Sequence, residues 1–217
     1  MNIHYSLIEL DNLTRIVDPN LIWSQNMAIR KSTYITLGGF HPCRMPPRFL
    51  DLFGDGETGL TKRAAEQNLV CVYTPGARVH HAVPTHRLDW SYLRKRAVIE
   101  GIAISFTTIR ESNEFREPIS KKGALFSLFA IFLLRLSSTV IITCARFSPP
   151  KYKVWLIQKL QQQGFNAGYK YHQLSANASS KLRDWIRQKT FWQCSLAPLE
   201  ADRTLRLLRW TCNWALR

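Results

Sequence analysis

Acidic residues are scarce in this sequence. Its 217 residues include 15 Asp or Glu against 30 Lys or Arg, which gives a formal net charge of +15. So basic a chain is expected to meet an anionic partner, such as nucleotide phosphates, a phospholipid surface or nucleic acid. The plainer interpretation is that the basic residues only form exposed faces that water solvates. Global disorder is excluded because 46% of the residues are apolar, which is enough for a real core.

A cysteine pattern typical of disulfides or of a zinc site is also missing. The five cysteines are odd in number, widely scattered and free of Cys-x-x-Cys spacing, so neither a disulfide framework nor a zinc site is indicated. We expect them to be reduced packing residues in a cytoplasmic setting. The first residues lack a basic stretch followed by a small-residue cleavage site, so we expect no export signal.

One glycine-rich acidic loop stands out. Asp55 lies between Gly54 and Gly56, and Glu57 follows Gly56. The loop leads into a basic helix that is expected from about Leu60 to Gln67, with Asn68 as the left-handed residue that ends it. Glycine lets the backbone turn sharply, so both carboxylates can project from the loop. Two interpretations stay open at this point: an acid-base site, or a turn in which Asp55 or Thr58 merely caps the helix.

The segments around this loop follow a recognisable order. Residues 26–30 read Asn-Met-Ala-Ile-Arg, and a helix then ends at Gly38-Gly39-Phe40. After the loop come a short buried strand expected at 69–73, a Pro-x-Ala at 75–77, and His81. In this order the segments resemble the acceptor half of a family 2 glycosyltransferase, and the resemblance covers about residues 20–110.

The resemblance implies a fold and a reaction. The fold would be α/β, a partial GT-A-like acceptor half with a mixed sheet, followed by a mainly helical, membrane-associated carboxy-terminal region. The reaction would be inverting transfer of a sugar from a nucleotide-sugar donor to a hydroxyl of a glycan or lipid-linked acceptor. Glu57 would be the general base, which typically contributes on the order of 10² to 10⁴ in rate, and Asp55 a supporting acid.

Further site residues follow from the same resemblance. The substrate site would be shaped by Asn26, Gly38, Gly39 and Phe40, with Arg63, Arg94 and Arg96 near the diphosphate. His81 would be a ligand of a divalent metal, Mg²⁺ or Mn²⁺. Without the resemblance, Gly38 is only a helix stop, His81 a polar surface residue, and the helix around Arg94 a basic amphipathic helix on a membrane.

One part of the resembled enzyme is not found in the sequence. The family's nucleotide-binding half is rich in strands and carries an Asp-x-Asp, whereas this chain has no Asp-x-Asp at any position. We therefore expect this chain to be the carboxy-terminal portion of a larger enzyme, either a truncated fragment that is inactive alone or a divergent form. A partner domain would then supply the nucleotide site and the metal. The alternative function is a non-catalytic basic protein, derived from such an enzyme, that binds a membrane or nucleic acid.

The most apolar run covers residues 124–145, with Arg135 at its middle. Its 22 residues could span a bilayer. The apolar side chains favour insertion by roughly 5 kcal/mol, whereas Arg135 opposes it by roughly 3 and the Ser and Thr residues add further cost. A full span and an interfacial helix both stay open, and we expect the protein at the cytoplasmic face of the membrane.

The chain thus divides into three expected regions. Residues 1–110 would be the acceptor-side half, 111–150 a linker and membrane-associated helix, and 151–217 a basic, Trp-rich helical tail with a turn at 164–168. Tryptophan beside arginine suits a lipid headgroup interface. The same combination suits single-stranded nucleic acid, but no nucleic-acid-binding signature accompanies it.

Overall fold

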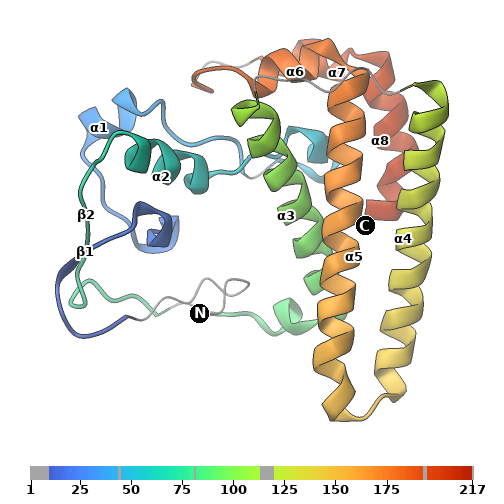
Figure 1. The fold of residues 1–217 in the computed structure, drawn as a ribbon, viewed down its shortest axis with the longest axis horizontal. Coiled ribbons are helices and arrows are strands. Elements are labelled where there is room, and N and C mark those ends of the chain that lie inside the picture. The colour runs from blue at the N-terminus through green and yellow to red at the C-terminus, as the bar shows by residue number, and fades with distance from the viewer. Residues whose placement is uncertain (1–9, 44, 81, 113–119, 193–194, 217) are drawn as a thin grey trace. The chain divides into compact units, whose positions relative to one another are not determined.

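The computed structural model of the chain describes residues 10–43, 45–80, 82–112, 120–192 and 195–216. The fold is mainly helical, with helix over 68% of the chain. Its described strands, β1 (Arg15–Val17) and β2 (Cys71–Tyr73), form one antiparallel pair (Figure 1). The predicted α/β class with a GT-A-like mixed sheet is therefore wrong.

The reason lies in the burial of the strand residues. Residues 69–73 are apolar enough for a buried core strand, but only Cys71–Tyr73 pairs, and it pairs with three residues alone. Val72 is 51% exposed, and its partner Ile16 is 71% exposed. Apolar residues on both strands thus stay at the surface, so this pair does not form the core of a sheet.

The chain forms two compact units. Unit 1 comprises the described residues of 1–43, 55–84 and 189–193, and unit 2 those of 44–54, 85–188 and 194–217. The three regions expected from the sequence, 1–110, 111–150 and 151–217, stay predictions.

Unit 1 is built around two helices and the strand pair. Leu37, Leu60 and Ala64 form its buried cluster. Gly38 and Gly39 both have positive φ, +79° and +72°, directly after the first helix, and Asn68 has φ +54° after the second. The sequence predicted these helix ends, and they are confirmed. The elements are α1 (Lys31–Thr36), α2 (Glu57–Glu66), η2 (Pro19–Leu21) and η3 (Ser24–Asn26).

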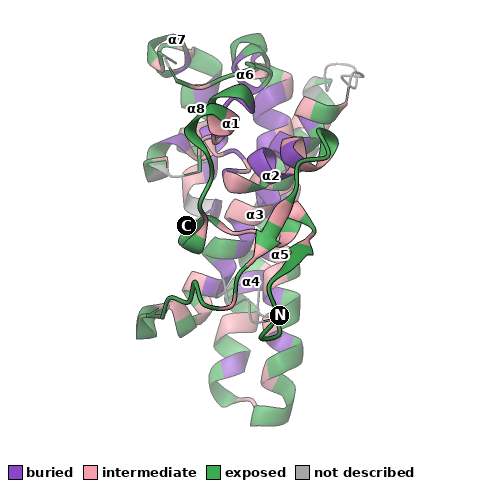
Figure 2. Cartoon of the chain, turned by 90° about the vertical axis from the view of Figure 1, so that its left-hand side faces the viewer, coloured by how far each residue is buried: buried purple, intermediate pink, exposed green. Residues whose placement is uncertain are grey.

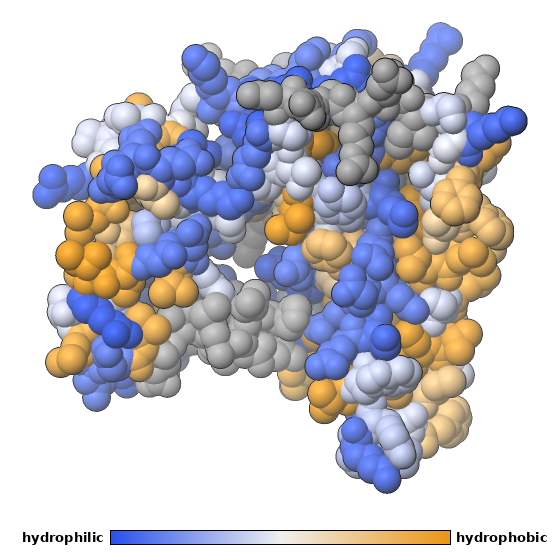
Figure 3. Space-filling view, viewed as in Figure 1, coloured by the Kyte–Doolittle hydropathy of each residue, from blue (hydrophilic) through white to orange (hydrophobic). Residues whose placement is uncertain are grey.

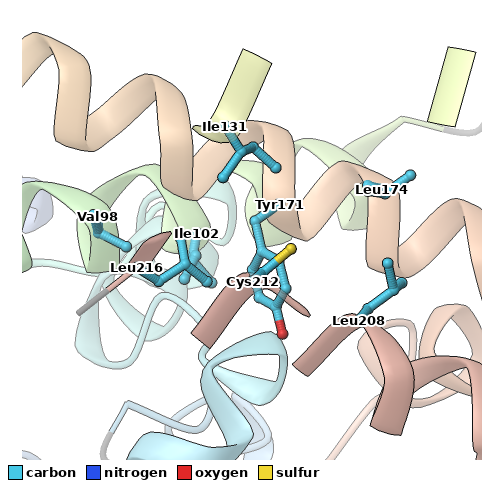
Figure 4. Packing of buried hydrophobic residues seen from close by; sticks show 8 residues of the cluster. All are labelled: Val98, Ile102, Ile131, Tyr171, Leu174, Leu208, Cys212 and Leu216. Carbon is cyan, nitrogen blue, oxygen red and sulfur yellow. The ribbon is translucent and has the colours of Figure 1, made fainter. Parts of the chain in front are cut away.

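Unit 2 is a helical stack with α5 (Pro150–Ala178) in the middle. α3 (Trp90–Glu111) packs along one side of α5 and α4 (Lys121–Phe147) along another, while α3 and α4 scarcely touch (Figure 1). Side chains from α3, α4, α5 and α8 meet around Tyr171 (Figure 4). The other elements are η4 (Pro47–Leu52), η5 (Thr85–Leu88), α6 (Ser180–Ile186), α7 (Ala197–Glu200) and α8 (Arg203–Leu216).

The turn predicted at 164–168 is wrong, because α5 runs through it without a break. Gly164 and Gly168 serve close packing instead. A Cβ at Gly164 would lie 2.7 Å from the carbonyl oxygen of Arg94, and one at Gly168 would overlap the carbonyl of Val98. Gly101 of α3 faces the backbone of α5 in the same way. Small residues spaced by four thus let the two backbones approach.

Helix α4 is mostly uncovered by the rest of unit 2. Among the described helices it alone is long and apolar enough to cross a membrane, over Lys122–Phe147. Its most apolar stretch has a mean hydropathy of 2.2, and only 11% of that stretch is buried. Figure 2 shows exposed residues prevailing at the hairpin end of α4 and α5. This length and composition support membrane association.

Replacing Gly168 by Ala should lower the free energy of unfolding by about 1–3 kcal/mol, because the added Cβ overlaps the backbone of α3. Helix propensity alone predicts the opposite sign, a gain of roughly 1 kcal/mol. Chemical unfolding followed by circular dichroism measures the difference. Gly76→Ala is the control, since a Cβ there meets nothing within 4 Å. A Gly168→Ala protein as stable as the parent would exclude the close contact.

Candidate functional site

The acidic loop is anchored by His41. The Nδ1 atom of His41 hydrogen-bonds a carboxylate oxygen of Asp55, and the two side chains are only 2% and 6% exposed. The backbone N–H of His41 also donates to the carbonyl of Gly56, at 3.3 Å. A side-chain bond and a backbone bond from one residue therefore hold the loop in place.

Arg63 extends this anchor to the end of α1. Its Nε donates to the carbonyl of Leu37 at 2.6 Å and its Nη2 to that of Gly39 at 2.5 Å. Its Nη1 lies 2.7 Å from Nε2 of His41. Because a guanidinium has only donors, Nε2 must accept, which leaves the imidazole proton on Nδ1 for Asp55. Arg63, His41 and Asp55 thus form one directed hydrogen-bond chain.

Two glycines make room for this chain. Gly56 has φ +55°, and a Cβ there would lie 2.7 Å from the Cβ of Cys43. At Gly59, in the first turn of α2, a Cβ would overlap both the His41 ring and the Asp55 carboxylate. Gly56 therefore serves both the turn of the loop and close packing against Cys43, while Gly59 serves packing against the buried pair.

The two carboxylates of the loop have different surroundings. Asp55 is nearly buried and engaged with His41. Glu57 is the first residue of α2, is partly exposed, and accepts no hydrogen bond from the residues that the structure describes. Glu57 is therefore the carboxylate that a ligand can reach, while Asp55 stabilises the loop through its hydrogen bond with His41.

The Gly38-Gly39-Phe40 turn is covered by the segment 189–192. The indole of Trp192 packs directly on Gly39, and its ring lies 5.2 Å from that of Tyr34 at 76°. Trp192 remains 50% exposed. Phe191 contacts the His41 ring, with centroids 5.4 Å apart. Sequence reasoning missed this cover, because no local pattern links positions about 150 residues apart. It also missed the role of His41, because no helical or strand spacing links His41 to Asp55 and Arg63, 14 and 22 residues further on.

Asn26 joins two of the motif segments. Its side-chain amide donates to the carbonyl of Ala77, which belongs to the Pro-x-Ala segment. Asn26, the Gly-Gly-Phe turn, the acidic loop and Arg63 all lie in unit 1. The structure thus brings these predicted residues into one compact unit.

The remaining predicted residues lie elsewhere. Arg94 and Arg96 belong to α3 in unit 2. Arg94 is 1% exposed and donates to the carbonyl of Leu216 at 3.4 Å, and burial, with a smaller contribution from Arg135, lowers its pKa to about 10. Arg96 is exposed. His81 lies outside the described residues.

No group of three or more His, Cys, Asp or Glu that could hold a metal ion occurs in the described part of the chain. The described residues therefore supply no complete ligand set for the expected divalent metal. No protein-family model, curated protein or solved structure matches the chain. The site is accordingly defined by its own geometry.

Removing the charge of Asp55 should destabilise unit 1 more than removing that of Glu57. Asp55→Asn should lower the free energy of unfolding by about 1–3 kcal/mol, because it leaves a buried hydrogen-bond chain without its anion. Glu57→Gln, at a partly exposed position, should change it by less than about 0.5 kcal/mol. Urea unfolding of both variants measures this. Equal effects would contradict the division of roles.

Proposed function

We propose that unit 1 is the acceptor-side part of an inverting glycosyltransferase that uses a nucleotide-sugar donor, with Glu57 as the general base. The observation that carries the proposal is that the loop is fixed by hydrogen bonds while the carboxylate of Glu57 accepts none from the described residues. His41 and Arg63 fix the loop, while Glu57 at its end keeps its carboxylate accessible. A base held this way needs little reorganisation during reaction.

In the proposed reaction, Glu57 takes the proton of an acceptor hydroxyl as its oxygen attacks the anomeric carbon of the donor sugar. The new bond forms on the face opposite the leaving group. The bond between the anomeric carbon and the diphosphate oxygen breaks, and the electron pair leaves with the nucleoside diphosphate. A positioned carboxylate is suited to the proton transfer.

Aromatic residues beside the Gly-Gly-Phe turn support a sugar acceptor. Trp192 offers a half-exposed indole on Gly39 and is held edge-on by Tyr34. An amphipathic ring of this kind can cover the apolar face of a sugar while hydroxyls stay wet. In this proposal Trp192 is a further acceptor-binding residue, together with Asn26, Gly38, Gly39 and Phe40.

The donor side of the proposal rests on a partner domain. That domain would hold the nucleotide diphosphate. Arg96, an exposed residue of α3, stays a predicted contact of the diphosphate. Mg²⁺ or Mn²⁺, with His81 as one ligand, belongs to the same part of the proposal. No reaction step is assigned to the metal, because the described residues supply no ligand set for it.

For the membrane, we propose that α4 lies in the cytoplasmic interface instead of spanning the bilayer. Its outer face is a broad apolar surface, seen along the side of α4 in Figure 3. The exposed members of this face are Leu125, Phe126, Phe129, Phe132, Leu133, Leu136, Val140 and Phe147. Such a face can sink into the headgroup and acyl boundary.

The partner helix opposes a full span. α5 returns directly alongside α4, and Ser138 near the middle of α4 hydrogen-bonds Gln163 at 3.2 Å. A spanning α4 would therefore place the exposed Gln162 near the bilayer centre. Lys170 would be close to it as well, because the neighbouring Tyr171 packs in one cluster with Ile131 of α4. A lysine costs roughly 3 kcal/mol at the centre of a bilayer. An in-plane α4 leaves α5 on its aqueous side.

Glu57→Gln should abolish transfer, reducing it by at least about 10². Nucleotide release and labelled product would be followed for the full chain in membranes with a panel of nucleotide sugars. Glu66→Gln is the matched control, since Glu66 is an exposed carboxylate at the other end of α2. Absence of transfer by the unaltered protein in its native membranes, with every donor, would favour the non-catalytic binding protein instead.

The two ends of α4 should lie on the same side of the membrane. Lys122→Cys and Arg146→Cys, both at exposed positions, would be introduced singly into a cysteine-free chain. An impermeant maleimide should label both in sealed vesicles whose cytoplasmic face is outward, and neither in vesicles of the opposite orientation. Labelling of only one position in each preparation would demonstrate a span.

A further inference from the structure

A second site candidate lies in unit 2, independent of the acidic loop. α8, α5 and η4 enclose a cavity of about 540 Å³. Such a volume is in the usual range for small-molecule sites. Along α8 the lining residues recur at helical spacing, at positions 206, 209, 210, 213 and 216, so one face of this helix forms a wall.

The wall is rich in guanidinium groups. Arg209 is fixed, because it donates to both carboxylate oxygens of Asp51 at 2.8 and 2.7 Å, and Asp51 is fully buried. Arg209 and Arg48 also both lie over the ring of Phe49, at 5.0 and 4.7 Å from its centroid. One aromatic ring thus gathers two cations, of which only Arg209 is neutralised.

Two of the lining cations are available to a ligand. Neither Arg48 nor Arg206 has an ion-pair partner within the described part of the chain, and both are exposed. Among the lining residues that the structure describes, Glu200 is the single acidic one. Two free guanidinium groups against one carboxylate leave the cavity attractive to an anion. Guanidinium groups bind phosphate oxygens through paired donors.

The other lining groups limit the chemical class of ligand that the cavity can bind. Trp210 is 79% exposed and stands one turn after Arg206, so it offers an apolar plane at the mouth. Glu200 repels a second anionic group but can accept hydrogen bonds from hydroxyls. We propose that this cavity binds a phosphate ester that carries free hydroxyls, such as the glycerol phosphate or sugar phosphate headgroup of a lipid.

The place of the cavity in unit 2 favours the lipid source. Leu216 lines the cavity and belongs to the buried cluster that also contains Ile131 of α4 (Figure 4). The cavity therefore adjoins the helix with the exposed apolar face. The same phosphate chemistry is present in a free sugar phosphate or glycerol phosphate, so the test must separate the two sources.

The test uses the full chain and two probes: phosphatidylcholine vesicles with and without phosphatidylglycerol, and free glycerol 3-phosphate followed by calorimetry in detergent. Arg206→Ala should weaken binding about tenfold more than Arg203→Ala. Arg203 is the matched control, because it is an exposed arginine on α8 outside the cavity. Arg206→Lys keeps the charge but loses the paired donors, and it should weaken binding as well.

The outcomes distinguish a lipid headgroup, a free phosphate ester and the absence of a binding site. Weakening seen only with phosphatidylglycerol vesicles identifies a lipid headgroup, and weakening seen with glycerol 3-phosphate identifies a free phosphate ester. If Arg206→Ala matched Arg203→Ala with both probes, and Arg206→Lys matched the parent, the site would be refuted. None of these results depends on Glu57 or on sugar transfer.

Discussion

Each unit depends on glycines at which another segment packs directly against the backbone. In unit 2, Gly101, Gly164 and Gly168 bring the backbones of α3 and α5 within reach of each other. In unit 1, Gly59 lets α2 lie directly on the His41 and Asp55 pair, and Gly39 admits the indole of Trp192. Any side chain at these positions would push apart the surfaces that define the core of one unit and the candidate site of the other.

The local signals in the sequence predicted local structure. Glycine at 38 and 39 and Asn68 marked helix ends because left-handed backbone is decided by the residue itself. The apolar run at 124–145 predicted a membrane-associated helix, and the run forms most of α4, whose length and composition support membrane association. Composition and turn chemistry were sufficient in these places.

The errors arose where distant partners decide the outcome. Gly164 and Gly168 are typical of a turn when read alone, but the backbone of α3 gives them a packing role inside α5. The residues at 69–73 have a strand's composition, but only Cys71–Tyr73 pairs, with the three residues of β1. Within the candidate site, Glu57 and Asp55 were visible as neighbours in sequence, whereas the bond to His41 and the cover by Trp192 were not.

The cover over the Gly-Gly-Phe turn also bears on the order in which the protein is made. Residues 189–192 complete unit 1, yet they are translated after the whole of α4 and α5. A nascent chain therefore carries an open Gly39 until its apolar helix has left the ribosome and can meet a bilayer. The indole of Trp192 therefore covers the Gly-Gly-Phe turn only after the apolar helix has been synthesised, so unit 1 is completed after α4 is available for membrane association.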